Sequence, residues 1–146
     1  MAGTAAERLA RGCANAMLAA RWLLPVAASA ERVSDPQILA EGRQVFEQHC
    51  AACHGSNGQG LVKDWKKPGA DGKYPPPPLN GTAHTWHHPF SQLHRVVKDG
   101  TARLGGNMPA WGGALSDRQI RHTLHYIISS WPEEIFREWE ARGGYQ

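Results

Sequence analysis

Apolar residues recur at helical spacing in three stretches of the chain. The first stretch begins at Ser34-Asp35-Pro36, where a capping residue followed by proline favours a helix start, and it continues to Cys50. Its repeating positions are Ile38, Leu39, Gly42, Val45, Phe46 and His49. This period predicts one amphipathic helix that leads directly into a cysteine.

Two further helices are predicted, separated by long irregular segments. The second begins at His88-Pro89 and ends at Gly100, and its apolar face consists of Phe90, Leu93, Val96 and Val97. A capping box over residues 116–119 begins the third, whose apolar positions are Ile120, Leu124, Ile127, Ile128 and Trp131. Pro132 interrupts this helix, and the acidic residues 132–146 are expected to form a solvated helical tail.

The segments between these helices are long for a compact domain. Residues 61–88 include the run Pro75-Pro76-Pro77-Pro78, which must be extended because each proline fixes its own φ and disfavours helix before it. Nothing in the chain alternates convincingly as a strand. The pattern predicts an all-α fold, and loops of this length indicate a functional reason, such as a large cofactor replacing part of the core.

Composition narrows the class of protein. The chain has 146 residues, of which 41% are hydrophobic, and a formal net charge of +3. This length suits one small domain, and the charge is too weak to argue for nucleic acid by itself. No run of about 18 uninterrupted apolar residues predicts a transmembrane helix.

The first 30 residues differ from the rest. Three arginines outnumber a single acidic residue there, and a short apolar core ends in Ala28-Ser29-Ala30. This order is typical of a secretory signal peptide cleaved after Ala30, with an amphipathic or disordered leader as the alternative. We therefore divide the chain into a leader (1–30) and a domain (31–146) with a core at 36–131 and the acidic tail at 132–146.

Three chemistries compete for the stretch that holds Cys50, Cys53 and His54. A zinc site would need further ligands, usually a second pair of cysteines or histidines, and a thioredoxin-like dithiol would need a strand–helix setting. Covalent haem attachment needs Cys-x-x-Cys-His, which is what the sequence contains. Cysteines one turn apart can reach the two vinyl groups of a porphyrin, and the following imidazole lies under the iron. We favour this third interpretation.

The chain resembles a class I c-type cytochrome over residues 36–131. The matching elements follow the order of that family: Gly42-x-x-x-Phe46, Cys50-Ala51-Ala52-Cys53-His54, Pro77-x-Leu79-x-Gly81, a middle helix, Met108-Pro109, and a last helix with Leu124 and Tyr126. The resemblance implies three to five helices with long loops wrapped around one covalently attached haem. It also implies that the first and last helices cross at Gly42.

The resemblance further implies the iron ligands and their neighbours. His54 would bind iron on one face, while a carbonyl at Pro77 would accept a hydrogen bond from the other ring nitrogen. Met108 would be the sixth ligand, although a loop methionine that covers apolar surface is a common alternative. Contacts with the haem are also expected from Leu79, Trp86 and Trp111, and ordinary core packing is the alternative for the two tryptophans.

Two clusters of side chains have more than one interpretation. The first, which could supply an iron ligand or bind copper or zinc, is His84, His87, His88 and His94. We favour helix capping, surface positions or hydrogen bonds to a propionate for these histidines. The second cluster consists of Lys63, Lys66, Lys67 and Lys73. We expect it to steer an acidic redox partner, and a solvated loop is the alternative.

These features together predict a one-electron carrier with His/Met-ligated haem rather than an enzyme. The alternatives are a haem enzyme or sensor with a labile sixth position, of the peroxidase or sulfur-compound oxidase type, and a metal-binding module built on the histidines. Haem attachment in this family takes place outside the bacterial inner membrane, so we expect a periplasmic protein, anchored to the membrane if the leader is retained. Its partners would be redox proteins, including a membrane-associated one, and not nucleic acid.

Overall fold

The computed structural model describes residues 31–146, so the predicted leader lies outside the described residues. Five α-helices are present: α1 Pro36–His49, α2 Ala51–His54, α3 Phe90–Asp99, α4 Asp117–Ser129 and α5 Glu133–Ala141. Two short 3-10 helices, η1 His84–His87 and η2 Ala102–Leu104, lie within the loops. The described part of the chain contains no β-strand, and this confirms the predicted all-α fold.

The helix starts follow the capping signals in the sequence. The Asp35 carboxylate accepts hydrogen bonds from the amides of Gln37 and Ile38, at 2.8 and 3.2 Å, just before α1. Ser116 and Gln119 form the predicted capping box at the start of α4. Helix α3 begins at Phe90 rather than at Pro89, since the N-cap position is occupied by Pro89 itself.

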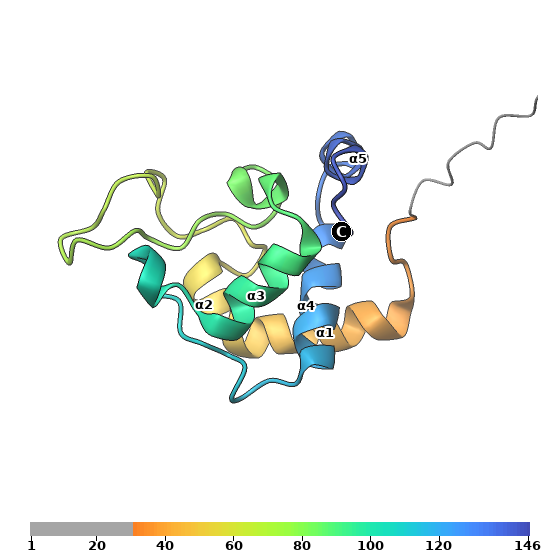
Figure 1. Cartoon of the computed structure of the whole chain (residues 1–146), viewed down its shortest axis with the longest axis horizontal. Coiled ribbons are helices and arrows are strands. Elements are labelled where there is room, and N and C mark those ends of the chain that lie inside the picture. Colours follow the sequence, from red (N-terminus) through yellow and green to blue (C-terminus); the bar gives the residue numbers. More distant parts are fainter. Residues whose placement is uncertain (1–30) are drawn as a thin grey trace, which may run out of the picture.

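Helices α1 and α4 cross at a glycine (Figure 1). A Cβ atom on Gly42 would lie 2.0 Å from the His122 carbonyl oxygen, so the two backbones meet where no side chain fits. One turn further along α1, the Phe46 ring packs on Tyr126 with 5.5 Å between ring centroids. The crossing that the family resemblance implied is therefore present.

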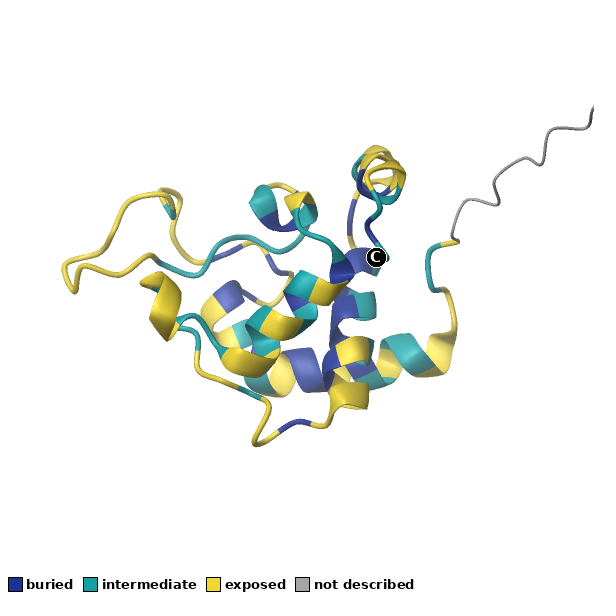
Figure 2. Cartoon of the chain, in the orientation of Figure 1, coloured by how far each residue is buried: buried dark blue, intermediate teal, exposed yellow. Residues whose placement is uncertain are grey.

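The buried apolar side chains gather where α1, α3 and α4 meet (Figure 2). Phe46, Ile120 and Ile128 are almost completely buried there. By contrast, the long loop over residues 61–74 is exposed along nearly its whole length (Figure 2). The core therefore anchors the helices and leaves the loops free to form the walls of a cavity.

The expectation of a solvated C-terminal tail is wrong for one face of that segment. Residues 133–141 do form a helix, but Phe136 and Trp139 are each only 1% exposed. These two residues are three positions apart and share one face of α5, while Glu133, Glu134 and Glu138 are exposed. The sequence pattern was obscured by the density of acidic residues around two large apolar side chains.

Helix α5 is fixed to the rest of the domain by hydrogen bonds to main-chain carbonyls. The Trp139 indole N–H donates to the His88 carbonyl (2.8 Å), and the Phe90 amide donates to the Gly144 carbonyl (2.6 Å). Near the start of the described residues, the Arg32 guanidinium donates to the Trp131 carbonyl (2.8 Å). In the described range no helix is both long and apolar enough to span a bilayer.

Candidate functional site

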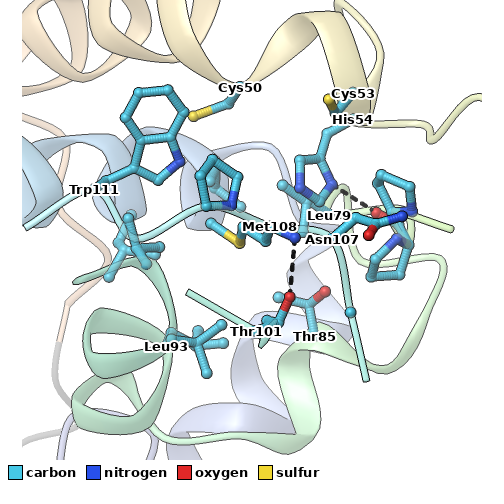
Figure 3. Close-up of a pocket in the computed structure, with 18 of the residues that line it drawn as sticks. Cys50, Cys53, His54, Leu79, Thr85, Leu93, Thr101, Asn107, Met108 and Trp111 are labelled. Atoms are coloured by element: carbon cyan, nitrogen blue, oxygen red, sulfur yellow. Dashed lines mark hydrogen bonds between the residues drawn. The ribbon is translucent and has the colours of Figure 1, made fainter. Parts of the chain in front are cut away.

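A cavity of about 540 Å³ lies between the helices and the two long loops. Its apolar lining includes Leu79, Leu93, Val96, Val97, Leu115, Leu124 and Ile127. Cys50, Cys53 and His54 enter it from one side, and Met108 enters from the loop before α4 (Figure 3). We call α1, α2 and residues 75–88 the His54 wall, and residues 100–115 the Met108 wall.

The two cysteines flank a single helical turn. Helix α1 ends at His49, and Cys50 is the N-cap of the short helix α2, so its carbonyl accepts the amide of Cys53 at 3.1 Å and that of His54 at 2.9 Å. Both cysteines are free thiols that line the cavity, Cys50 buried and Cys53 exposed. Burial, with a smaller contribution from Cys53, raises the pKa of the Cys50 thiol to about 11.

His54 is held by one ring nitrogen. Its Nδ1 lies 2.9 Å from the Pro77 carbonyl oxygen, and because a carbonyl only accepts, Nδ1 carries the proton and donates. Burial lowers the pKa of His54, although the bond to Pro77 acts in the opposite direction. The predicted hydrogen bond is therefore present. It leaves the lone pair on Nε2 of a neutral imidazole free to bind a metal ion.

The proline run is fixed in turn by neighbouring backbone. The amides of Leu79 and Asn80 both donate to the Gly58 carbonyl, at 2.6 and 3.2 Å. The Trp131 indole N–H donates to the Leu79 carbonyl at 2.7 Å. The Thr85 hydroxyl donates to the Pro78 carbonyl at 3.1 Å. These contacts hold the carbonyl that orients His54.

Met108 is half-buried and is positioned by the end of α3. The Met108 amide donates to the Thr101 hydroxyl at 3.0 Å, and the Thr101 amide donates back to the Met108 carbonyl, also at 3.0 Å. Gly100 allows this approach, because a Cβ there would lie 2.8 Å from the Met108 carbonyl oxygen. The Met108 wall is thus attached mainly to the helix that precedes it.

The remaining predicted contacts divide into two groups. Leu79 and Trp111 line the cavity, as expected. Trp86 lies outside the lining: its ring stacks on His87 at 4.0 Å, and the Arg142 guanidinium lies 5.2 Å from its centroid. Trp65, for which the sequence pattern predicts no role, lines the cavity. It stands in a lysine-rich loop without periodicity, so no sequence signal marked it.

The histidines also divide. His84 and His88 line the cavity with 5.5 Å between their ring centroids, and the Nδ1 atom of His84 is buried without a hydrogen-bond partner. Burial and the neighbouring charges of His88, His87 and Lys66 lower the pKa of His84. His87 is exposed, and His94 lies 3.6 Å from the Asp117 carboxylate.

The histidines do not form a separate metal site. Within residues 31–146, no group of three His, Cys, Asp or Glu side chains is arranged to hold a metal ion. His84 and His88 instead belong to the wall of the cavity that Cys50 and Cys53 also line. The hypothesis of a metal-binding module therefore has no support in the described part of the chain.

The cavity and its donors fit a covalently attached haem. Two thiols one turn apart, a neutral imidazole with its second nitrogen bonded to a carbonyl, and a thioether all open on the same apolar space. Cys50 and Cys53 would hold the porphyrin through thioether bonds, and His54 and Met108 would bind its iron.

Comparison with known proteins agrees with this chemistry. The model of the family "Cytochrome C oxidase, cbb3-type, subunit III" matches residues 37–127, which is more than half of the chain. The chain is similar to cytochrome c6 of Cladophora glomerata, with 32% identity over 94 residues that cover 64% of this chain and 89% of the relative. The chain belongs to the class I c-type cytochromes. The cofactor of this cytochrome is a covalently bound haem c.

Other relatives of this cytochrome are longer proteins. A cbb3-type cytochrome c oxidase subunit CcoP of Azospirillum brasilense is 31% identical over 97 residues, which cover 66% of this chain and 30% of the relative. A thiosulfate dehydrogenase of Stutzerimonas stutzeri (strain A1501) is 36% identical over 93 residues, covering 62% of this chain and 27% of the relative. The cytochrome therefore spans less than a third of the length of these curated relatives. No solved structure matches it.

Proposed function

We propose that this cytochrome carries single electrons between redox proteins, with its haem attached through Cys50 and Cys53 and ligated by His54 and Met108. The main support for the proposal is that two potential iron ligands, an imidazole and a thioether, line the same cavity. His54, with Nδ1 bonded to the Pro77 carbonyl, and Met108 both line the space that the two thiols enter. Two protein ligands would leave no coordination position for a substrate.

The chain's own groups set the conditions for electron transfer. The haem supplies an iron that cycles between the ferrous and ferric states. The Pro77 carbonyl keeps the His54 proton on Nδ1 and increases the basicity of Nε2. The thioether of Met108 is a soft, weak donor that favours the reduced state and raises the reduction potential. Most of the cavity lining is apolar, which would limit the access of water to a haem bound there.

The proposed docking surface for partners is the rim of the cavity near residues 61–74. Tyr74 and Leu104 line the cavity and are also exposed, by 50% and 71%. Leu61 and Val62 add exposed apolar area in the same loop. Charge is supplied by Lys63, Lys66, Lys67 and Lys73, which are all exposed. An apolar centre beside lysines favours a brief encounter with an acidic redox protein.

The relatives suggest where such a partner is found. Several of them are named as subunits of cbb3-type cytochrome c oxidases, so a membrane-associated oxidase is the partner that we propose. The leader over residues 1–30 and a periplasmic location remain part of the same proposal. They are supported by the signal-like composition and by the need for attachment outside the inner membrane.

Absorption spectroscopy of the purified holoprotein tests the proposed ligand pair. The ferric wild type should show the weak far-red band of thioether ligation, and Met108→Ala should lose it while keeping its covalent haem. The reduction potential should fall in the same variant. A wild type without this band, or a band that persists in Met108→Ala, would contradict the assignment of Met108.

A second candidate function is supported by the relative named thiosulfate dehydrogenase. In that case the domain would take electrons directly from a sulfur compound. Adding thiosulfate to the ferric protein separates the two functions. A carrier should stay oxidised until a protein donor is added, whereas fast reduction by thiosulfate alone would favour the enzyme.

A further inference from the structure

Thr101 uses its three polar groups to organise the loop that contains Met108. Its hydroxyl accepts the Met108 amide at 3.0 Å (Figure 3), and its amide donates to the Met108 carbonyl, also at 3.0 Å. Its carbonyl accepts the amides of Leu104 and Gly106, at 2.8 and 3.0 Å. Because Thr101 bonds to both the amide and the carbonyl of Met108, it fixes the position and the orientation of the Met108 backbone.

The surrounding sequence is built around this contact. A Cβ on Gly106 would lie 2.3 Å from the Thr101 hydroxyl oxygen, so the hydroxyl occupies the space that a side chain at 106 would need. Pro109 has no amide hydrogen, which makes the Met108 amide the last donor before Ala110. Losing its acceptor would leave that donor without a partner beside the cavity.

The contacts on either side of Met108 do not replace Thr101. Beyond Pro109, the Trp111 amide donates to the Val97 carbonyl at 3.1 Å, which ties the far end of the segment to α3. Before Met108, the Asn107 amide side chain donates to the exposed carboxylate of Asp71 at 2.9 Å. Neither contact acts on the main chain of Met108 itself.

We propose that Thr101 is the positioning residue for the sixth ligand. Its hydroxyl holds the Met108 backbone so that the thioether stays directed into the cavity (Figure 3). This inference rests on the proposed function, since it assumes that Met108 binds the iron. Thr101 acts through Met108, and its removal weakens the hold of the protein on that ligand without removing the ligand.

The test measures how readily exogenous imidazole displaces the thioether in the ferric holoprotein. Thr101→Val keeps the shape of the side chain but removes the acceptor, and its affinity for imidazole should rise on the order of tenfold, the factor that one lost hydrogen bond represents. Thr101→Ala should change in the same direction. Thr101→Ser, which keeps the hydroxyl, should remain close to wild type.

Thr82→Val is the matched control. It deletes a threonine hydroxyl that bonds to the Asn80 side chain at 2.6 Å, and Thr82 does not line the cavity. Its imidazole affinity should equal that of wild type. Wild-type affinity in both Thr101→Val and Thr101→Ala, or an equal increase in Thr82→Val, would overturn the role of Thr101.

The experiments distinguish a wrong assignment of Met108 from a wrong role for Thr101. If the wild type lacks the far-red band, the assignment of Met108 fails, and the inference about Thr101 fails with it. If the band is present and disappears in Met108→Ala, but Thr101→Val resists imidazole as well as wild type, only the positioning role is wrong.

Discussion

The two walls of the cavity are secured in different ways. Contacts from distant parts of the sequence hold the His54 wall: His54 bonds to Pro77, and the indoles of Trp131 and Trp139 bond to the carbonyls of Leu79 and His88. The Met108 wall is held mainly by α3 and by Thr101, which are close to it in sequence. One ligand is therefore coupled to the whole fold, and the other to a local loop.

The contrast indicates which of the two ligands the protein can release more easily. Opening the Met108 wall breaks mainly hydrogen bonds within residues 97–112, together with two exposed-loop contacts, from Asn107 to Asp71 and from Tyr74 to Gly105. Local openings of this kind cost less free energy than global unfolding. Opening the His54 wall also requires Trp131, just after α4, and Trp139 of α5 to lose their hydrogen bonds. We therefore expect damage to the His54 wall to unfold the domain, and damage to the Met108 wall to change its ligation.

The largest effect is expected from Cys50→Ser, which breaks the His54 wall at its attachment. The haem would fill a space that core side chains occupy in other small domains. A chain that cannot keep its haem should therefore be colourless and unfolded. Haem content and far-UV circular dichroism measure both results. Cys13→Ser, in the predicted leader, is the control and should mature normally, and a coloured, folded Cys50→Ser protein would contradict the attachment.

Gly42→Ala tests the helix crossing behind the His54 wall. The new methyl group would collide with the His122 carbonyl, and we expect a loss of roughly 3 kcal/mol in the free energy of unfolding. Gly113→Ala is the same substitution in the Met108 wall, at a position where a Cβ meets nothing within 4 Å. Denaturant unfolding of the two holoproteins should separate them clearly, and equal stabilities would show that the backbones do not meet at Gly42.

Trp139→Phe tests whether α5 supports the His54 wall. The phenyl ring still fills most of the buried space, but the His88 carbonyl loses its donor, and we expect a cost of roughly 2 kcal/mol. The far-red band should keep its wild-type intensity, because the Met108 wall is not touched. Trp86→Phe, at a ring stacked on His87, is the matched control. A larger cost in the control would place the support elsewhere.

The smallest effect concerns pH and His125, a residue of α4 whose ring centroid lies 4.9 Å from that of Phe90 and 6.3 Å from that of Tyr145. Burial, with the charges of His122 and Arg121, lowers the pKa of His125. A folded pKa below the unfolded value means that stability is intact above the unfolded value of about 6.5 and falls as the pH drops through it. Between about pH 7 and pH 5, the melting temperature of His125→Leu should therefore fall by less than that of wild type. Equal losses would exclude His125 as a source of the acid sensitivity.

The sequence predicted those parts of the fold that are set by local signals. Asp35 and the Ser116 capping box begin their helices where expected, and Gly42 marks the crossing because only glycine fits between two touching backbones. The attachment motif is contiguous, so its geometry follows from one helical turn. The bond from His54 to Pro77 was implied by the family resemblance rather than by any local pattern.

The missed features depend on how loops and the tail fold back. The sequence does not distinguish Trp86 from Trp65 as a residue that lines the cavity. The path of the loop turns Trp65 toward the cavity and leaves Trp86 against His87. The burial of Trp139 depends on where α5 packs, and its acidic neighbours suggested a solvated helix. Thr101 carried no sequence signal, since its role arises from a contact seven residues along an irregular loop.

The exposed loop between the two ligands has a practical consequence. Residues 61–74 are exposed apart from Trp65, and exposed loops rich in polar residues are preferred sites of proteolytic nicking. A trypsin cut after Lys66 would leave the haem on the first fragment and Met108 on the second. Because α1 and α4 remain crossed on different fragments, the halves should stay associated. The cytochrome thus offers a two-fragment complementation system in which colour reports one half and the far-red band reports its reunion with the other.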